Sequence, residues 1–387
     1  MNRRQFQAFA LKASAAALLS RAEWAAATPS ALRQDAPGKT ASANSSSSSS
    51  SVSDLYRRAV VIDSLGGLFN TDSLPSAERL AAVRGSGVTA VHTTVSDFTF
   101  EGTVNGIAAL EELIEKLPDA FLLVRKVSDI GRAKRENKIG VLPGFQYTTF
   151  LEDDPERIAT FRKLGVRIMQ LTYNLRGRFG DGCLERGNAG LSQAGVDAVK
   201  KMNEAGVAVD LSHSGYRTTS EGIAASAKPV LVSHAGCAAV YAHPRNKPDE
   251  ILRALAERGG YFGVYLMPYL VASPTVPTRE HVMAHLLHAI DVCGADHVGI
   301  GSDHAIEKVE MTAQQEALFK EDMARRQKLG IAAPGEDRYP YVPDVNGPGA
   351  MELIANEMAK RGQPSSVIEK VLGANFERVL GDIWGHD

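Results

Sequence analysis

Two histidines, each preceded by a serine, are the strongest chemical signal in the sequence. His213 ends the largely apolar run 207–213, and His234 ends the run 229–234. If both runs are neighbouring β-strands, the two imidazoles lie at the same end of a sheet, about one or two strand spacings apart. At that separation they can share one divalent ion, and imidazole is a common zinc ligand. A single histidine after a strand is usually a polar loop residue, but the repeated context favours a metal site.

Other polar residues end runs of the same kind. Asp303 ends the run 297–303, whose glycines let the backbone pass close to a ligand, and Gln146 follows the run 139–144. A carboxylate in such a place ligates a metal ion or moves a proton to and from its water. The alternative for Asp303 is a helix N-cap. His92 and His304 are expected near the same mouth, as supporting or surface histidines.

These residues need a scaffold that brings the ends of several strands together. Short runs rich in Val and Ile alternate with longer amphipathic segments, which predicts a parallel sheet covered by helices. Eight such runs favour a closed (β/α)₈ TIM barrel with C-terminal packing helices between residues 346 and 384. An open nucleotide-binding sheet would need a G-x-G-x-x-G turn, which is absent after the first run. The runs are 59–63, 88–93, 139–144, 166–174, 207–213, 229–234, 261–267 and 297–303.

The N-terminal residues predict export. Arg3 and Arg4 precede a mildly apolar run and the alanines 25–27, so we interpret residues 1–27 as a twin-arginine signal and expect a periplasmic protein. The alternative is an ordinary amphipathic helix. Residues 28–53 contain a run of serines and are predicted to be a flexible linker before a catalytic domain at 54–387.

The composition limits the classes of partner that the protein is expected to bind. The net charge is −2, and no block of Lys and Arg occurs after residue 30, so a nucleic-acid partner is not expected. No later stretch is apolar enough to predict stable membrane insertion. The three cysteines are too few for a disulfide framework, and packing is the simpler reading of them. A small-molecule substrate is therefore expected, and we leave a homodimer open.

From about residue 54 to 384 the chain resembles the membrane (renal) dipeptidases, which are zinc hydrolases with a (β/α)₈ barrel. The resemblance implies that His213 and His234 bind a metal ion and that Asp303 contacts the nucleophilic water as the catalytic proton carrier. It also implies that Arg245 holds a substrate carboxylate, for which a planar guanidinium is well suited. The matching stretches include Leu171-Thr172-Tyr173-Asn174, Asp210-Leu211-Ser212-His213, Pro244-Arg245-Asn246, Gly299-Ile300-Gly301-Ser302-Asp303 and Leu372-Gly373-Ala374-Asn375-Phe376.

Three departures from the family pattern change the expected site. The family's His-x-Asp metal pair falls on Leu65 and Gly67, its bridging glutamate on Gln146, and a substrate-contacting histidine on Tyr173. A neutral amide does not bridge two divalent ions as a carboxylate does, so we expect one zinc per chain. His213 and His234 would hold it, with Gln146 or Asp303 completing the shell, and Arg245, Tyr173 and Asn246 would bind the substrate.

The resulting hypothesis is a metal-dependent hydrolase that cleaves a dipeptide or another small amide with a free carboxylate. One alternative is a dipeptidase-like protein that no longer cleaves peptides and carries out a tailoring reaction on a secreted metabolite. Another is a non-catalytic protein that binds a small carboxylate at the barrel mouth. A measurement of bound metal distinguishes this last hypothesis from the other two.

Overall fold

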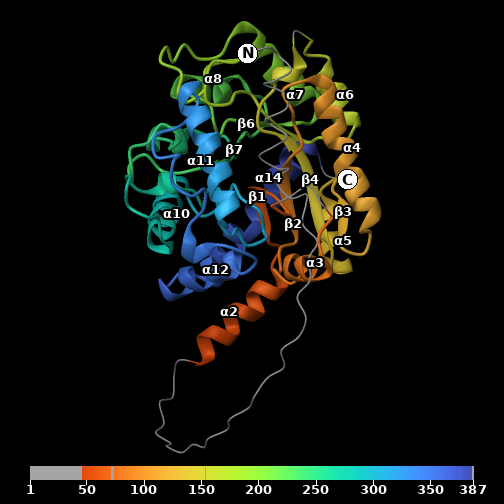
Figure 1. The fold of residues 1–387 in the computed structure, drawn as a ribbon, viewed down its shortest axis with the longest axis vertical. Coiled ribbons are helices and arrows are strands. Elements are labelled where there is room, and N and C mark those ends of the chain that lie inside the picture. Colours follow the sequence, from red (N-terminus) through yellow and green to blue (C-terminus); the bar gives the residue numbers. More distant parts are fainter. Residues whose placement is uncertain (1–45, 71–73, 153, 386–387) are drawn as a thin grey trace, which may run out of the picture.

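Parallel β-strands form one curved sheet, and eight of them make a nearly closed barrel with helices outside it (Figure 1). The computed structural model describes residues 46–70, 74–152 and 154–385. The predicted (β/α)₈ barrel is confirmed. In barrel order the strands are β1 (Ile62–Gly66), β2 (Ala90–Thr94), β4 (Ile139–Phe145), β5 (Ile168–Gln170), β6 (Ala208–Asp210), β7 (Leu231–Ala235), β8 (Tyr261–Val264) and β9 (Val298–Ile300).

The barrel closes where the residues after β1 meet those after β9. The amide of Asp303 donates to the carbonyl of Leu65 at 2.8 Å, and the amide of Gly67 donates to the carbonyl of His304 at 3.1 Å. Ile306 returns a bond to Gly67 at 2.8 Å. These bonds place Asp303 beside the first strand, at the carboxyl ends where barrel enzymes carry their catalytic groups.

A ninth strand, β3 (Phe121–Leu123), was not predicted. Gly140 of β4 pairs with Ala90 of β2 and with Leu122 of β3, so β3 lies on the opposite edge of β4 from β2. Its three residues give too short an apolar run to be separated from the end of the preceding helix by pattern alone.

Several predicted strands are longer than the observed ones. The run 166–174 contains only β5, and the run 207–213 contains only β6. The reason is local: the side-chain amide of Gln170 donates to the carbonyl of Thr172 at 2.8 Å, and Asp210 Oδ1 accepts from the amide of Ser212 at 2.9 Å. These bonds replace the strand ladder and turn the chain into the loops that carry the site.

Several helices follow the predicted amphipathic segments. α7, for example, begins at the N-cap Ser192, whose hydroxyl accepts from the amide of Gly195, and ends at Gly206 in the left-handed conformation. The described helices are α2 (Ser46–Arg58), α3 (Ala77–Arg84), α4 (Phe100–Lys116), α5 (Ser128–Glu136), α6 (Arg157–Lys163), α7 (Gln193–Ala205), α8 (Tyr216–Ala225), α9 (Asp249–Glu257), α10 (Arg279–Cys293), α11 (Ala313–Lys328), α12 (Ala350–Lys360), α13 (Ser365–Glu369) and α14 (Asn375–Trp384). None of the helices in the described parts of the chain is long and apolar enough to cross a membrane.

The N-terminal boundary of the fold differs from the prediction. Helix α2 (Ser46–Arg58) begins inside the segment 28–53, so the linker prediction is wrong for its last eight residues. Val52, Leu55 and Tyr56 are buried, and α2 packs against α12, which explains why this end is ordered. The predicted export signal at 1–27 and the remainder of the linker lie outside the described residues.

Helix α14, labelled at the centre of Figure 1 near β1, packs against the amino-terminal ends of the barrel strands. It contacts β1, β6, β8 and β9, and its Phe376, Val379, Leu380 and Ile383 are buried. They belong to one apolar cluster with the first residues of several strands, including Ile62, Ala90, Ile168, Ala208, Leu231 and Tyr261. The opening at the carboxyl ends of the strands is not covered by α14, and the candidate site lies there.

Candidate active site at the carboxyl ends of the strands

Asp210 fixes the two Ser-His pairs relative to one another. Its Oδ1 accepts from the hydroxyl of Ser212 at 2.5 Å and from the amide of Ser233 at 3.2 Å, and its Oδ2 accepts from the hydroxyl of Ser233 at 2.5 Å. The Ser212 hydroxyl in turn accepts from the amide of His234 at 3.1 Å. One buried carboxylate therefore joins the ends of β6 and β7, and the two imidazole centroids lie 5.0 Å apart.

His213 is held in a single orientation by Asn174. The side-chain amide of Asn174 donates to the carbonyl of Ile331 at 3.0 Å, so its Oδ1 is the atom that accepts from His213 Nδ1 at 2.7 Å. Nε2 of His213 therefore carries a lone pair, and this buried atom has no hydrogen-bond partner among the described residues. Burial, with Arg245 nearby, holds the pKa of His213 well below its usual value. The imidazole is therefore neutral, and its Nε2 is available to accept a hydrogen bond or to bind a metal ion.

His234 has the same protonation pattern as His213, with the proton on Nδ1 and the lone pair on Nε2. Because the Ser233 hydroxyl donates to Asp210, its oxygen accepts from His234 Nδ1 at 2.9 Å. Nε2 of His234 then accepts from the side-chain amide of Gln146 at 3.4 Å, and that amide also lies 3.5 Å from Asp303 Oδ1. Burial again holds the pKa of His234 well below its usual value. The structure thus brings His213, His234, Gln146 and Asp303 to one mouth, as predicted.

Asp303 sits in an unusual backbone conformation. Its φ is 61°, in the left-handed region that few residues other than glycine adopt. Such conformations persist where the surrounding structure enforces them, and they cluster at functional sites. Although the residue is partly exposed, desolvation of its carboxyl raises the pKa of Asp303 to about 6, against an opposing effect of Arg245. This carboxyl takes up a proton more readily than an ordinary aspartate does.

Arg245 and Lys247 lie on the loop after β7 and bond to the backbone around the two histidines. The Arg245 guanidinium donates to the carbonyl of Ser212 at 2.6 Å and to that of His234 at 3.4 Å, and the side chain is buried. Lys247 Nζ donates to the carbonyl of Ser214 at 2.6 Å, and burial lowers the pKa of Lys247 to about 7. Since a guanidinium has five N–H donors, Arg245 keeps donors for a further acceptor.

Two predicted substrate-binding residues differ in their surroundings. Tyr173 stacks on His213, with ring centroids 4.3 Å apart and an angle of 21° between the rings, and it lines an open cavity. Asn246 is buried; its side chain donates to the carbonyls of Tyr241 at 2.8 Å and Tyr269 at 3.2 Å and accepts from the hydroxyl of Tyr265. These bonds hold the loop that carries Arg245, so Asn246 positions that loop and does not join the group around His213.

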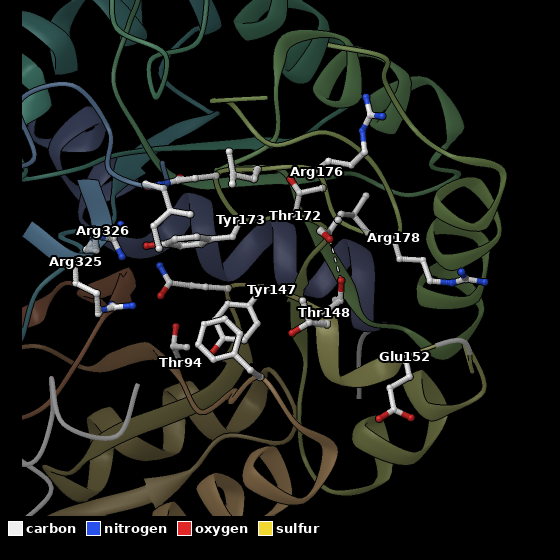
Figure 2. Close-up of a pocket in the computed structure, with 18 of the residues that line it drawn as sticks. Thr94, Tyr147, Thr148, Glu152, Thr172, Tyr173, Arg176, Arg178, Arg325 and Arg326 are labelled. Carbon is white, nitrogen blue, oxygen red and sulfur yellow. Dashed lines mark hydrogen bonds between the residues drawn. The ribbon is translucent and has the colours of Figure 1, made fainter. Parts of the chain in front are cut away.

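A cavity of about 810 Å³ adjoins this group (Figure 2). Its wall includes Gln146, Tyr147 and Tyr173, from the loops after β4 and β5, and Arg326 from α11. Neither Arg326 nor Tyr147 was predicted from the sequence to belong to the site, and α11, which carries Arg326, is a largely polar helix with one buried residue.

The sequence model of the membrane dipeptidase family (peptidase family M19) matches residues 69–327, more than half of the chain. This chain belongs to the membrane dipeptidase family. Dipeptidase verJ of Clonostachys rogersoniana is 31% identical to it over 327 residues, which cover 82% of this chain and 73% of that protein. The family resemblance inferred from the sequence is therefore confirmed. The relatives also support the prediction that the protein is an enzyme of the hydrolase class, a peptidase.

Solved structures agree with this membership. An amidohydrolase from Pseudomonas aeruginosa superposes with a TM-score of 0.74 and 32% identity, over 87% of this chain and 99% of that one. A metallo peptidase from Rhodobacter sphaeroides, liganded with a phosphinate mimic of the dipeptide L-Ala-D-Ala, has a TM-score of 0.67 over 84% of this chain and 99% of that one. Its identity is 16%, so it supports the barrel fold alone.

Membrane dipeptidases are metallopeptidases, and part of this site fits a metal ion. The lone pairs on Nε2 of His213 and of His234 are the form of imidazole that binds metals. The amide of Gln146 offers an oxygen as a further donor once it turns. Within the described ranges, no three His, Cys, Asp or Glu side chains form a cluster able to hold a metal ion. The two histidines therefore fit one ion, while a full family-type ligand set is not present there.

A second ion does not fit beside β1. Leu65 and Gly67 offer no donor side chain, and Asp63 already accepts from the amide and the hydroxyl of Ser302 and from the amide of Leu65. The cavity next to Asp63 measures about 10 Å³, and a single water needs about that much space. The residues beside β1 therefore do not fit a second ion of the family's binuclear plan.

Proposed function

We propose that this membrane dipeptidase is a metal-dependent hydrolase of small peptides or related amides that carry a free carboxylate. One zinc ion per chain would be held by His213, His234 and Gln146. The observation that carries the proposal is the pairing of two buried imidazoles, 5.0 Å apart between centroids, each with an Nε2 lone pair: that of His213 has no partner among the described residues, and that of His234 faces the Gln146 amide, which also lies near Asp303. Zinc in such a place supplies Lewis acidity, which lowers the pKa of water and polarises a carbonyl.

The protein groups divide the remaining work. Arg245, buried and bonded to the carbonyls of Ser212 and His234, presents its free N–H donors to the substrate carboxylate. Asp303, whose pKa is raised to about 6, takes a proton from the attacking water and delivers it to the leaving amine. Tyr173 lies flat on His213 and shields that side of the imidazole from solvent.

The test combines elemental analysis of the purified protein with a panel of dipeptides, assayed with and without a chelator. We expect about one zinc per chain and release of amino acids that stops on chelation. Asp303→Asn should keep the metal and lose activity by about 100- to 10,000-fold, the usual contribution of a general base.

Variants of the histidines locate the metal. His213→Ala and His234→Ala should each lose metal, whereas His288→Ala should not, since His288 bonds to Asp249 on α9, away from the mouth. Full metal occupancy in both site variants would place the ion elsewhere. Metal without any peptide or amide hydrolysis would leave a metal site but reject the peptidase activity.

We also propose that the protein acts in the periplasm. The support is the sequence of residues 1–27, with Arg3 and Arg4 ahead of an apolar run and an alanine cluster. Replacing both arginines by lysine should stop export through the twin-arginine route, which fractionation of cells followed by immunoblotting detects. Unchanged export of the double lysine variant would contradict the proposal.

A further inference from the structure

The cavity beside the catalytic mouth has room for more than a dipeptide. Its volume of about 810 Å³ lies in the upper part of the range of about 300 to 1,000 Å³ that holds drug-sized ligands. It is continuous with the site, because Gln146 and Tyr173 line it while also contacting His234 and His213. Figure 2 shows Tyr173 and Arg326 at one end of this cavity and Arg178 and Glu152 toward the other.

Aromatic rings form an unbroken wall from the cavity to the histidines. Phe98 stacks on Tyr147 with centroids 4.8 Å apart and an angle of 11°, and Tyr147 meets Tyr173 edge-on at 6.2 Å. Tyr173 then stacks on His213. The hydroxyl of Tyr147 donates to the carbonyl of Ser96 at 3.0 Å, which fixes its ring. Rigid aromatic faces of this kind favour a planar, conjugated partner.

Arg326 provides a polar contact at the inner end. Its Nη2 bonds to Glu336 at 2.5 Å, but its buried Nε has no hydrogen-bond partner among the described residues. A buried N–H donor of this kind calls for an acceptor, which a ligand carbonyl supplies. Arg176, at the rim, is already bonded to both carboxylate oxygens of Asp181, at 2.6 and 3.0 Å. Arg325, which also lines the cavity, is bonded to Asp322. Because these two arginines already have carboxylate partners, the cavity favours a neutral group over an anion.

We propose that the natural substrate carries a large, planar and neutral acyl group, which stacks along Phe98, Tyr147 and Tyr173 and offers its carbonyl oxygen to Arg326. This inference rests on the proposed function, since it names the substrate class of the same site. Arg245 comes from the loop after β7 and does not line the cavity, which opens between the loops after β4 and β5. The acyl group thus lies at the end of the substrate opposite its carboxylate.

Two probes whose glycyl-alanine bond cannot be hydrolysed test the proposal by calorimetry on the purified, metal-loaded protein. They are 2-naphthoyl-glycyl-alanine and acetyl-glycyl-alanine, each with CH₂ in place of the NH of the glycyl-alanine bond. We expect the naphthoyl probe to bind at least about tenfold more tightly, since each aromatic contact adds about 0.5 to 1.5 kcal/mol. Equal binding of the two probes to the wild-type protein would overturn the proposal.

Variants separate the two contacts. Tyr147→Leu should remove most of the preference for naphthoyl, and Phe98→Ala, at an exposed position on the rim, should reduce it without affecting the fold. Arg326→Lys keeps a cation for Glu336 and should weaken both probes by a similar factor. Tyr216→Leu, at an exposed tyrosine on α8 outside the cavity, should change nothing.

Each outcome decides one question. A preference for naphthoyl that survives both Tyr147→Leu and Phe98→Ala undiminished would reject the aromatic wall as its cause. A preference that depends on these residues, in a protein that hydrolyses no peptide or amide, would support the acyl site and reject the proposed function. The two failures are therefore distinguishable.

Discussion

Replacing Asn174 by leucine tests how the histidine pair is prepared. Asn174 holds the proton of His213 on Nδ1 and so leaves Nε2 free to bind. Leucine has no acceptor, so His213 Nδ1–H and the carbonyl of Ile331 both lose their partners in a buried region. Each group left unsatisfied costs about 1 to 3 kcal/mol of folding stability. Removing such a support for a metal-binding histidine typically weakens metal affinity by about 10- to 100-fold, or about 1.4 to 2.8 kcal/mol.

A matched control separates stability from site geometry. Asn375 is also buried, and its side chain donates to the carbonyls of Ala295 at 2.7 Å and Val298 at 2.8 Å, far from the mouth. Asn375→Leu should therefore destabilise the fold by a similar amount and leave metal affinity unchanged. Asn174→Asp keeps an acceptor for His213 and should retain the metal.

The assay pairs urea unfolding with zinc titration against a competing chelator. Nitrogen NMR shifts of labelled histidine report the tautomer directly, in wild type and variants. We expect Asn174→Leu alone to lose affinity and to show a changed His213 signal. If Asn174→Leu binds zinc as tightly as the wild type does, either His213 is no ligand or Asn174 does not set its tautomer.

Further predictions concern the surrounding residues. Arg245→Ala should raise KM for carboxylate substrates on the order of a hundredfold with a smaller effect on kcat, and an unchanged KM would remove the carboxylate role. Gln146→Glu should leave the zinc content at about one per chain, because Leu65 and Gly67 still provide no ligand; elemental analysis giving two would contradict the one-metal site. Burial lowers the pKa of Lys247 to about 7, so the unfolded chain binds a proton that the folded chain lacks between that pH and the ordinary lysine pKa of 10.5. Stability should therefore rise with pH across this window, by at most about 5 kcal/mol, and Lys247→Met should abolish the rise. Urea midpoints measured at both ends of the window check this, and a parallel rise in the variant would assign the effect to another group.

The sequence was sufficient to predict the barrel, because most of the strands are apolar runs separated by amphipathic helices. It was also sufficient to bring His213, His234, Gln146 and Asp303 together, since each follows a strand and all parallel strands end at one face. It could not reveal that Asn174 orients His213, because the two residues are 39 positions apart and meet only through the pairing of β5 with β6.

Arg326 shows a second limit. It comes from α11, a helix with a single buried residue, Met323, whose sequence has no clear apolar face to predict where it packs. Its approach to Tyr173 depends on how the segment after β9 folds back over the mouth. Likewise, Asn246 beside Arg245 looked like a substrate contact, but only the structure shows its amide committed to Tyr241, Tyr269 and Tyr265.

The position of α14 constrains the order in which the molecule can fold. The strands of the barrel all precede Asn375 in the chain, yet the apolar cluster at their amino-terminal ends is closed off by Phe376, Val379, Leu380 and Ile383 of α14. A chain that has emerged from the ribosome as far as β9 therefore exposes this cluster to solvent and to chaperones. Closure of the barrel floor must wait for the final helix, so a stop codon placed before Asn375 should yield a protein that is captured by chaperones or aggregates, whatever the state of its catalytic mouth.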